Sequence, residues 1–214
     1  MKKNFGIIGN PIKHSLSPVL HNYWFDKYSL DADYSIIEAT DKNLAEITSK
    51  IKNGSLAGIN VTLPFKQKII NHVDRIINDA EQTGSVNTVL LDADNFIIGE
   101  NTDVYGLQAA YLKEIENDLK KKSLVIGAGG VSPSVILSLQ KSGIKNISIT
   151  NRTNEKCIFL KKKFNNITIL DPAEPEISTE AIISTELPFD GFAPDGKVLL
   201  NRLLIVRVLP PLDS

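Results

Sequence analysis

The segment Gly58–Lys66, with the sequence GINVTLPFK, places a lysine where a buried-looking strand gives way to a predicted helix. The first turn of a helix carries unpaired N–H groups and the positive end of the macrodipole, so it disfavours an ammonium group. A lysine in such a place can exchange a proton with a bound substrate. The segment makes Lys66 a candidate acid–base residue, although an arbitrary lysine on a surface helix is only a solvated charge.

An amide and a carboxylate follow two other predicted strands. Gly84–Thr88 (GSVNT) contains Asn87, and Gly99–Asp103 (GENTD) ends in Asp103. Strand ends are where α/β sheets hold their ligands. Asn87 and Asp103 are therefore candidate ligand-binding residues, but Asp103 could also serve only as the N-cap of the next helix.

Two serines flank a predicted helix start in Gly9–Val19 (GNPIKHSLSPV), with Pro18 in the first turn. Hydroxyls beside the N–H groups of a helix N-terminus make a suitable seat for a small carboxylate. Ser17 is equally well explained as the N-cap, whereas Ser15 has no such explanation. Both are candidate substrate ligands.

A glycine-rich turn lies between a strand and a helix in Ser123–Ser134 (SLVIGAGGVSPS). Such a turn lets the backbone approach a pyrophosphate, whose charge then meets the helix N-terminus. Ser132 stands where the usual pattern has its third glycine, and it is small enough for close helix packing. The context favours a dinucleotide site over a purely structural turn.

The end of the next strand indicates which dinucleotide binds. An NAD site has a carboxylate there for the ribose 2′-hydroxyl, whereas an NADP site has an arginine for the 2′-phosphate. This chain has Asn151, Arg152 and Thr153, so a guanidinium replaces the carboxylate. NADP is therefore the expected cofactor.

These residues must be positioned by an alternation of short apolar runs and helical patterns, which is typical of α/β proteins with parallel strands. The sequence predicts two α/β domains, an N-terminal substrate-binding domain (1–103) and a C-terminal Rossmann-like domain (104–214). In the first we expect strands at 5–9, 34–38 and 57–61, helices at 18–28, 43–52 and 65–73, and a hairpin of 86–91 with 96–99. In the second we expect a helix at 104–115, a charged loop at 116–122, strands from 123 and at 146–150, 167–170 and 181–184, and helices near 132–142 and 155–164.

Composition excludes several classes of protein. The chain has 214 residues and a net charge of −1, with dispersed basic residues, so nucleic acid is not a favoured partner. No apolar run is long enough to span a bilayer, and no export signal is visible. Cys157 is the only cysteine, which rules out a disulfide framework within one chain and favours a reducing, cytoplasmic setting.

The histidines and the tryptophan do not indicate chemistry. His14, His21 and His72 lack metal-like spacing, so they are expected at the surface or in packing contacts, and no metal is expected. Trp24 lies with Phe25 and Tyr28 on a helix at core spacing and is expected to be packed.

Taken together, the motifs GNPIKHSLSP, NVTLPFK, GSVNT, NTD, GAGG and NRT resemble the shikimate dehydrogenase family, in that order, over residues 5 to about 170. The resemblance implies reversible NADP-linked oxidation of shikimate to 3-dehydroshikimate, in the pathway to chorismate and the aromatic amino acids.

The resemblance also implies the role of each site residue. Ser15 and Ser17 would hold the substrate carboxylate; Thr62, Asn87 and Asp103 would contact its ring hydroxyls; and Lys66 with Asp103 would form the catalytic pair. The implied cofactor-binding residues are Gly127, Ala128, Gly129, Gly130, Val131, Asn151, Arg152, Thr153 and Lys156.

The chain departs from the family pattern after about Asp171, although Ala181–Thr185 still matches a family strand. The family's tyrosine-bearing strand and glutamine-bearing helix, which contact substrate, are absent. We therefore expect an open site with weak shikimate binding and low turnover. The unmatched run Leu203–Val206 is expected either to form an edge strand or to promote association.

Two other functions stay open. One is a non-catalytic protein that binds a dinucleotide or shikimate, and the other is an NAD-using quinate/shikimate dehydrogenase, which Arg152 disfavours. A monomer or a homodimer is expected.

Overall fold

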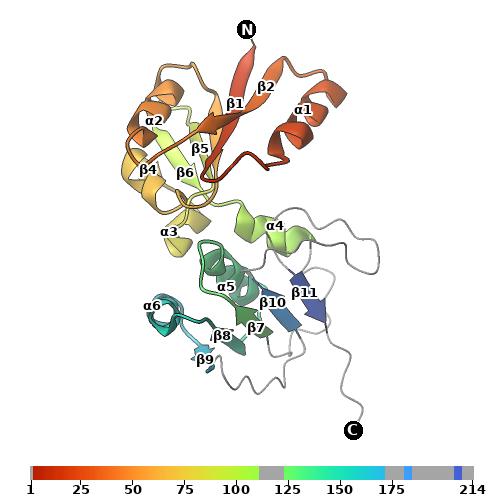
Figure 1. The fold of residues 1–214 in the computed structure, drawn as a ribbon, viewed down its shortest axis with the longest axis vertical. Coiled ribbons are helices and arrows are strands. Elements are labelled where there is room, and N and C mark those ends of the chain that lie inside the picture. Colours follow the sequence, from red (N-terminus) through yellow and green to blue (C-terminus); the bar gives the residue numbers. More distant parts are fainter. Residues whose placement is uncertain (1, 111–122, 172–180, 185–204, 209–214) are drawn as a thin grey trace. The chain divides into compact units, whose positions relative to one another are not determined.

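The chain folds into two units, Met1–Thr102 and Asp103–Ser214, each built around its own β-sheet (Figure 1). The computed structural model describes residues 2–110, 123–171, 181–184 and 205–208. Strands alternate with helices in both units, so the predicted α/β fold class is confirmed. The charged loop expected at 116–122 lies outside the described residues.

The first unit has a six-stranded sheet in the order β2-β1-β3-β5-β6-β4. Its strands are β1 (Lys3–Gly9), β2 (Ala32–Glu38), β3 (Gly58–Val61), β4 (Arg75–Ile76), β5 (Thr88–Leu91) and β6 (Ile97–Glu100). Strands β2, β1 and β3 are parallel, and β5 runs antiparallel to both β3 and β6. The parallel strands therefore bring their carboxyl ends to one edge, and β5 with β6 forms the predicted hairpin.

Helices α1 (Ser17–Lys27) and α2 (Leu44–Lys52) cover opposite faces of this sheet (Figure 1). Leu44, Ile47 and Ile51 of α2 lie on one side of the helix and are buried in the same core cluster as Ile8 of β1. Burying each such side chain contributes about 1.5–3 kcal/mol. Because strand side chains alternate between faces, Phe5 points the other way.

Helix α1 packs less deeply than the sequence predicts. Phe25 contacts Phe5 with the ring centroids 5.7 Å apart, as expected of a packed residue. Trp24, however, is 42% exposed, and Tyr28, which follows the helix, is 65% exposed. The expected burial of Trp24 is therefore wrong.

The side chain of Asn22 attaches α1 to the outermost strand, β2. Its amide nitrogen donates to the carbonyl of Tyr34, and its amide oxygen accepts from the N–H of Tyr34, both at 2.9 Å. An edge strand would otherwise leave these backbone groups for another strand to pair with. Helix α1, whose N-terminal end carries the two candidate serines, is thus attached to the sheet.

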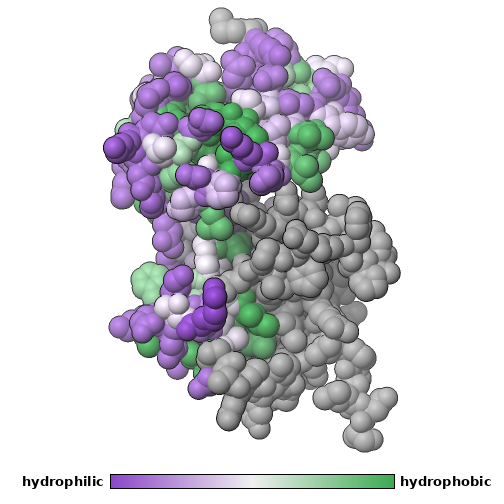
Figure 2. Space-filling view, in the orientation of Figure 1, coloured by the Kyte–Doolittle hydropathy of each residue, from purple (hydrophilic) through white to green (hydrophobic). Residues whose placement is uncertain are grey.

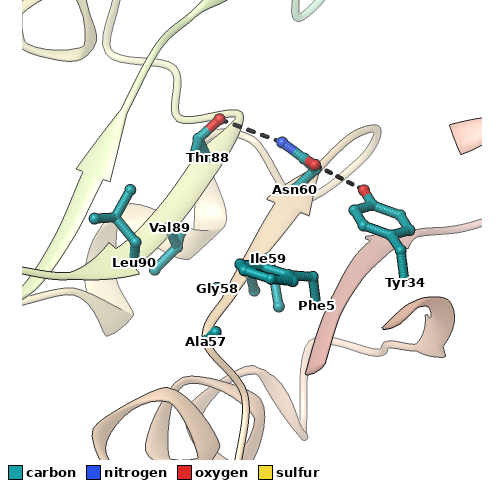
Figure 3. A pocket seen from close by; sticks show the side chains of 9 residues that line it. All are labelled: Phe5, Tyr34, Ala57, Gly58, Ile59, Asn60, Thr88, Val89 and Leu90. Atoms are coloured by element: carbon teal, nitrogen blue, oxygen red, sulfur yellow. Dashed lines mark hydrogen bonds between the residues drawn. The ribbon is translucent and has the colours of Figure 1, made fainter. Parts of the chain in front are cut away.

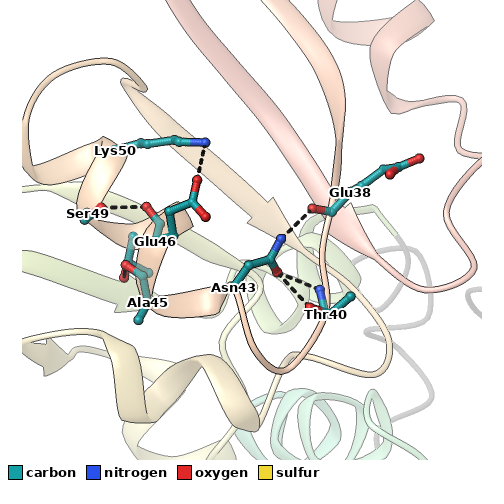
Figure 4. Close-up of polar contacts among 8 residues, drawn as sticks. Glu38, Thr40, Asn43, Ala45, Glu46, Ser49 and Lys50 are labelled. Atoms are coloured by element: carbon teal, nitrogen blue, oxygen red, sulfur yellow. Dashed lines mark hydrogen bonds and ion pairs between the residues drawn. The ribbon is translucent and has the colours of Figure 1, made fainter.

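Asn43 organises the connection from β2 to α2 (Figure 4). Its amide oxygen accepts the N–H of Thr40 at 2.7 Å, and its amide nitrogen donates to the carbonyl of Glu38 at 3.2 Å. One turn further on, Lys50 pairs with Glu46 at 2.9 Å on the exposed side of the helix. The short β2–α2 connection is closed by a side chain acting as a backbone partner.

Two short helices complete the first unit, η1 (Lys68–His72) and α3 (Asp79–Thr83). Element η1 is a 3₁₀-helix of five residues, and residues 66 and 67 before it form a turn. The helix predicted for 65–73 is therefore confirmed only over Lys68–His72, as a 3₁₀-helix, and is wrong at Lys66. Phe65, at the start of this segment, is buried in the core of the first unit.

The second unit has a five-stranded sheet in the order β11-β10-β7-β8-β9. Its elements are α4 (Asp103–Ala110), β7 (Ser123–Ile126), α5 (Ser132–Lys141), β8 (Ile147–Thr150), α6 (Asn154–Lys163), β9 (Ile167–Ile169), β10 (Ala181–Ser184) and β11 (Ile205–Val208). All strands are parallel except β11, which pairs antiparallel with β10 at the edge. Of the run Leu203–Val206, for which an edge strand or association was expected, Ile205 and Val206 belong to the edge strand β11, and residues 203 and 204 lie outside the described residues.

Helix α5 is the centre of the second core. Val135, Ile136 and Leu139 are at most 1% exposed. Ser138 donates its hydroxyl hydrogen to a backbone carbonyl, with Oγ 3.0 Å from the carbonyl oxygen of Val104 in α4 and 2.7 Å from that of Ser134. Its small side chain lets the two helices approach closely.

The surface of the first unit shown in Figure 2 has hydrophilic side chains surrounding a smaller apolar centre. Within the described ranges, no helix combines the length and the apolar character that crossing a bilayer requires.

Candidate active site

Backbone hydrogen bonds join three segments at the carboxyl end of β1 and β3. The N–H of Thr62 donates to the carbonyl of Ile8 at 2.9 Å, and the N–H of Val61 donates to the carbonyl of Asn87 at 2.8 Å. A Cβ added at Gly9 would lie 2.5 Å from Cγ2 of Thr62, so glycine is needed for this close approach. Thr62 and Asn87 are thus positioned by one sheet edge.

Lys66 lies in the turn between β3 and η1. Its side chain is only 6% exposed, and its carbonyl accepts the N–H of Val86 at 2.8 Å. The helix-start argument for this lysine is not supported, because the five-residue 3₁₀-helix begins two residues later, at Lys68. What distinguishes Lys66 from a solvated surface lysine is burial beside the strand end.

Asn87 is 9% exposed and is held by the segment after β6. The N–H of Thr102 donates to Oδ1 of Asn87 at 3.0 Å, and Nδ2 of Asn87 donates to Oγ1 of Thr102 at the same distance. Asp103 follows directly as the first residue of α4, where a carboxylate is stabilised by the helix N-terminus. Thr102 therefore links the two candidates, because it bonds Asn87 and directly precedes Asp103.

The serine pair differs from the prediction in one respect. Ser17 is the first residue of α1 and Leu16 occupies the cap position, so Ser17 is not the N-cap. The N–H of Ser17 donates to Oγ of Ser15 at 3.3 Å, which gives Ser15 the local structural role that the sequence did not reveal. In that bond Ser15 is the acceptor, so its hydroxyl hydrogen can still be donated.

The glycine-rich turn connects β7 to α5. Gly127 has φ 103°, which favours glycine, and its N–H donates to the carbonyl of Thr150 at 2.8 Å. A Cβ added at Gly129 would meet nothing within 4 Å, so packing does not require glycine there. The chain continues through Gly130 and Val131, and Val131 occupies the cap position of α5.

The side chain of Asn151 holds the glycine-rich turn through hydrogen bonds. Its Oδ1 accepts the N–H of Ala128 at 3.3 Å, and its Nδ2 donates to the carbonyl of Thr153 at 2.9 Å. Asn151 is buried, whereas Arg152, Thr153 and Lys156 are exposed. The exposed guanidinium and ammonium are thus presented at the strand end next to the glycine-rich turn, and Asn151 connects the two loops.

A polar group that the sequence analysis missed crosses the α1 face of the first sheet (Figure 3). Tyr34 donates its hydroxyl to Oδ1 of Asn60 at 2.7 Å, and Nδ2 of Asn60 donates to Oγ1 of Thr88 at 3.3 Å. Burial raises the pKa of Tyr34, which keeps its hydroxyl a donor. The available signal was Asn60 itself, a polar residue within an otherwise apolar strand.

These three residues border a cavity of about 100 Å³ on that face, whose other lining residues include Phe5 and Leu90 (Figure 3). Across the described residues, no cluster of three or more histidine, cysteine or acidic side chains is arranged to hold a metal ion.

Two family models match the chain. The shikimate dehydrogenase substrate-binding domain matches residues 7–89, and the shikimate/quinate 5-dehydrogenase model matches residues 110–184. The first covers the serines, Thr62, Lys66 and Asn87. The second covers the glycine-rich turn and Arg152.

Known proteins agree with these models. The shikimate dehydrogenase (NADP(+)) of Pelagibacter ubique is 45% identical over 170 residues, which are 79% of this chain and 64% of that protein. The crystal structure of the Aquifex aeolicus shikimate dehydrogenase is 38% identical with a TM-score of 0.78, covering 86% of this chain and 69% of that one. The Thermus thermophilus enzyme, solved with NADP(H) and shikimate, is 29% identical with a TM-score of 0.77, covering 86% and 68%.

The fold and the site motifs together define a two-unit α/β protein whose second unit has a Rossmann-like arrangement of parallel strands and helices. The chain belongs to the shikimate dehydrogenase family. It spans 64% of the length of its Pelagibacter relative.

Proposed function

We propose that the protein interconverts shikimate and 3-dehydroshikimate with NADP as the hydride acceptor or donor. The observation that carries this is the buried Lys66 at the carboxyl edge of the first sheet, on the segment that also holds Thr62. The relatives' names support the substrate and the cofactor. Residues 1–103 would bind substrate and residues 104–214 would bind NADP.

The residues of the second unit fit NADP. The open space at Gly129 allows a ligand to approach the backbone, and the adjoining N-terminus of α5 favours an anionic pyrophosphate. Exposed Arg152 would pair with the 2′-phosphate, with Thr153 and Lys156 beside it. Asn151 would act mainly by holding the turn that Gly127, Ala128, Gly130 and Val131 complete.

Bound NADP supplies a nicotinamide ring that takes a hydride from a carbon bearing a hydroxyl. Oxidation of that carbon also requires the hydroxyl proton to leave, and Lys66 would accept it at Nζ and pass it to solvent. Asp103 would hold the reacting hydroxyl. In reduction of 3-dehydroshikimate the lysine returns the proton to the carbonyl oxygen.

Other residues of the first unit would hold the substrate. Thr62 and Asn87 would bond its ring hydroxyls, and Ser15 and Ser17 would bond its carboxylate. The two hydrogen bonds between Asn22 and Tyr34 support the role of the serines in binding the carboxylate, because they attach α1, which begins at Ser17, to β2. A cytoplasmic location and a monomeric or dimeric state are part of the proposal, and the buried thiol of Cys157, which forms no disulfide, is consistent with a reducing compartment.

The decisive experiment is oxidation of shikimate with NADP and with NAD in separate assays, alongside calorimetry with each ligand. Turnover with NADP in clear preference to NAD supports the proposal. Preference for NAD, or for quinate as substrate, would favour the quinate/shikimate reading. Binding without turnover would favour a non-catalytic binding protein.

A further inference from the structure

Asn87, the proposed ligand of the substrate ring, is connected to a chain of side-chain hydrogen bonds that begins at the far edge of the sheet. Tyr34 of β2 donates to Asn60 of β3, and Asn60 donates to Thr88 of β5 (Figure 3). Oγ1 of Thr88 then donates to Oδ1 of Asn87 at 3.0 Å. None of these three residues has a role in the proposed function so far.

The backbone explains why this chain can form. Asn60 and Thr88 are direct partners in the antiparallel pairing of β3 with β5, so their side chains lie on the same face. Tyr34 is 4% exposed, and its backbone is held by Asn22 through two bonds of 2.9 Å. Gly58 lines the same cavity as Tyr34 and Asn60, and a Cβ added there would lie 3.0 Å from the carbonyl oxygen of Val89.

The order of donors gives the chain a direction. The hydroxyl of Tyr34 occupies Oδ1 of Asn60, which turns Nδ2 of Asn60 toward Thr88. Because Oγ1 of Thr88 accepts that hydrogen, its own hydrogen goes to Oδ1 of Asn87. The N–H of Thr102 also donates to Oδ1 of Asn87, and Nδ2 of Asn87 donates to Oγ1 of Thr102, so Thr88 and Thr102 together hold the orientation of this amide.

We propose that the hydrogen-bonded series of side chains Tyr34–Asn60–Thr88 positions the amide of Asn87 for substrate binding. The inference rests on the proposed function for its consequence, since Asn87 must contact the substrate for its orientation to matter. Tyr34 and Thr88 are positioning residues that act through Asn87. Loss of a link removes or weakens the bond from Thr88 to Oδ1 of Asn87, so the amide is held by Thr102 with one fewer restraint and shikimate binds more weakly.

Thr88 allows a test that separates positioning from folding. Thr88→Val keeps the shape but removes the hydroxyl, whereas Thr88→Ser keeps the hydroxyl and removes a methyl group. Thr88→Val is expected to raise the Kd and KM for shikimate about 3–10-fold, the effect of one hydrogen bond, with kcat changed less. Thr88→Ser should bind within about twofold of the unmodified protein even if it unfolds at lower temperature.

Tyr34→Phe tests the start of the chain and should weaken shikimate binding about 2–5-fold. Tyr23→Phe is the matched control, because that hydroxyl is exposed on α1. In an Asn87→Ala background, Thr88→Val and Tyr34→Phe should have no further effect, since they act through the missing amide. Affinity for NADP should not change in any variant.

The proposal is overturned if Thr88→Val binds shikimate normally, if Thr88→Ser is as weak as Thr88→Val, or if the effects persist unchanged in Asn87→Ala. If the unmodified protein does not bind shikimate at all, the proposed function fails instead. The hydrogen bonds from Tyr34 to Asn87 are then tested by measuring hydrogen exchange of the Asn87 side-chain amide in NMR spectra. Faster exchange in Thr88→Val supports the chain, and unchanged exchange contradicts it.

Discussion

Lys66 is a candidate acid–base residue for one reason in the sequence and for a different reason in the structure. The sequence drew attention to it through a helix start that the structure does not contain. Its burial at 6% exposure and its place beside the strand end are what set it apart. Lys68, two residues on, is exposed and pairs with Asp41 at 2.7 Å.

Lys66→Gln is therefore expected to lower kcat by about 10²–10⁴-fold, the usual contribution of a positioned acid–base group. Shikimate affinity measured by calorimetry should change much less. Lys68→Gln removes a nearby surface charge and should leave kcat unchanged. A Lys66→Gln protein that keeps more than half of the turnover would remove this lysine from the mechanism.

His21 is a second residue whose surroundings have measurable consequences. Its ring stacks on Tyr34 with centroids 4.2 Å apart and meets Trp24 edge-on at 5.6 Å. Burial lowers the pKa of His21 below its ordinary value of 6.5, because the imidazolium is poorly solvated there. The neutral ring therefore contributes stability that is fully present above pH 6.5 and is lost as the pH falls through the lowered pKa.

The pH dependence of Trp24 fluorescence should report this titration, since Trp24 is the only tryptophan. We expect a transition with its midpoint below 6.5 and, over the same interval, a fall in the melting temperature of the first unit. His21→Phe should abolish the fluorescence transition. A midpoint at or above 6.5 would show that the ring is not desolvated as the structure indicates.

At the scale of elements, the second unit contains two glycines that differ mainly in backbone conformation. An added Cβ would meet nothing within 4 Å at either Gly106 in α4 or Gly143 after α5. Gly143 has φ 82°, and its N–H donates to the carbonyl of Gln140 as α5 ends. Gly106 lies within a helix, where alanine is the better residue.

Gly106→Ala is expected to stabilise the second unit by about 0.4–1 kcal/mol by reducing the freedom of the unfolded chain. Gly143→Ala should destabilise it by about 1–2 kcal/mol, the cost of a left-handed conformation for a residue with a Cβ. Urea unfolding followed by circular dichroism measures both. Equal effects of the two substitutions would mean that backbone conformation does not decide the outcome.

At the scale of the whole molecule, the site residues divide between the two units. The candidate ligands of shikimate other than Asp103 lie in Met1–Thr102, and those of NADP lie in the second unit. The two ligands should therefore respond to different substitutions.

Arg152→Ala is expected to weaken NADP binding about 10–150-fold, because charge-assisted bonds to the 2′-phosphate are lost. NAD and shikimate affinities should stay within about twofold, since neither ligand makes those bonds. Ser15→Ala should do the reverse, weakening shikimate and leaving NADP unchanged. Lys161→Ala, an exposed change on α6, is the control for Arg152. Equal losses for NADP and NAD in calorimetry would contradict the assignment of Arg152.

Local sequence alone was sufficient for much of the fold. The alternation of apolar runs predicted the parallel strands, and β10 (Ala181–Ser184) was placed at its observed bounds. The hairpin of β5 and β6 followed from turn-forming residues, and Asn95 indeed has φ 64°. These features depend on preferences that act within a few residues. The order of the motifs was equally local, and the family models cover all of them except NTD, which lies between the two matched ranges.

Only the tertiary structure decided features that depend on distant residues. A turn stands at Lys66 in place of the predicted helix, next to the buried Phe65, and α1 packs Phe25 against Phe5 while Trp24 stays exposed. The bonds from Tyr34 to Asn60 and from Asn60 to Thr88 join residues 26 and 28 positions apart. Sequence specified which residues could bond, whereas sheet order and register determined which of them meet, because cross-strand neighbours are set by the assembled sheet.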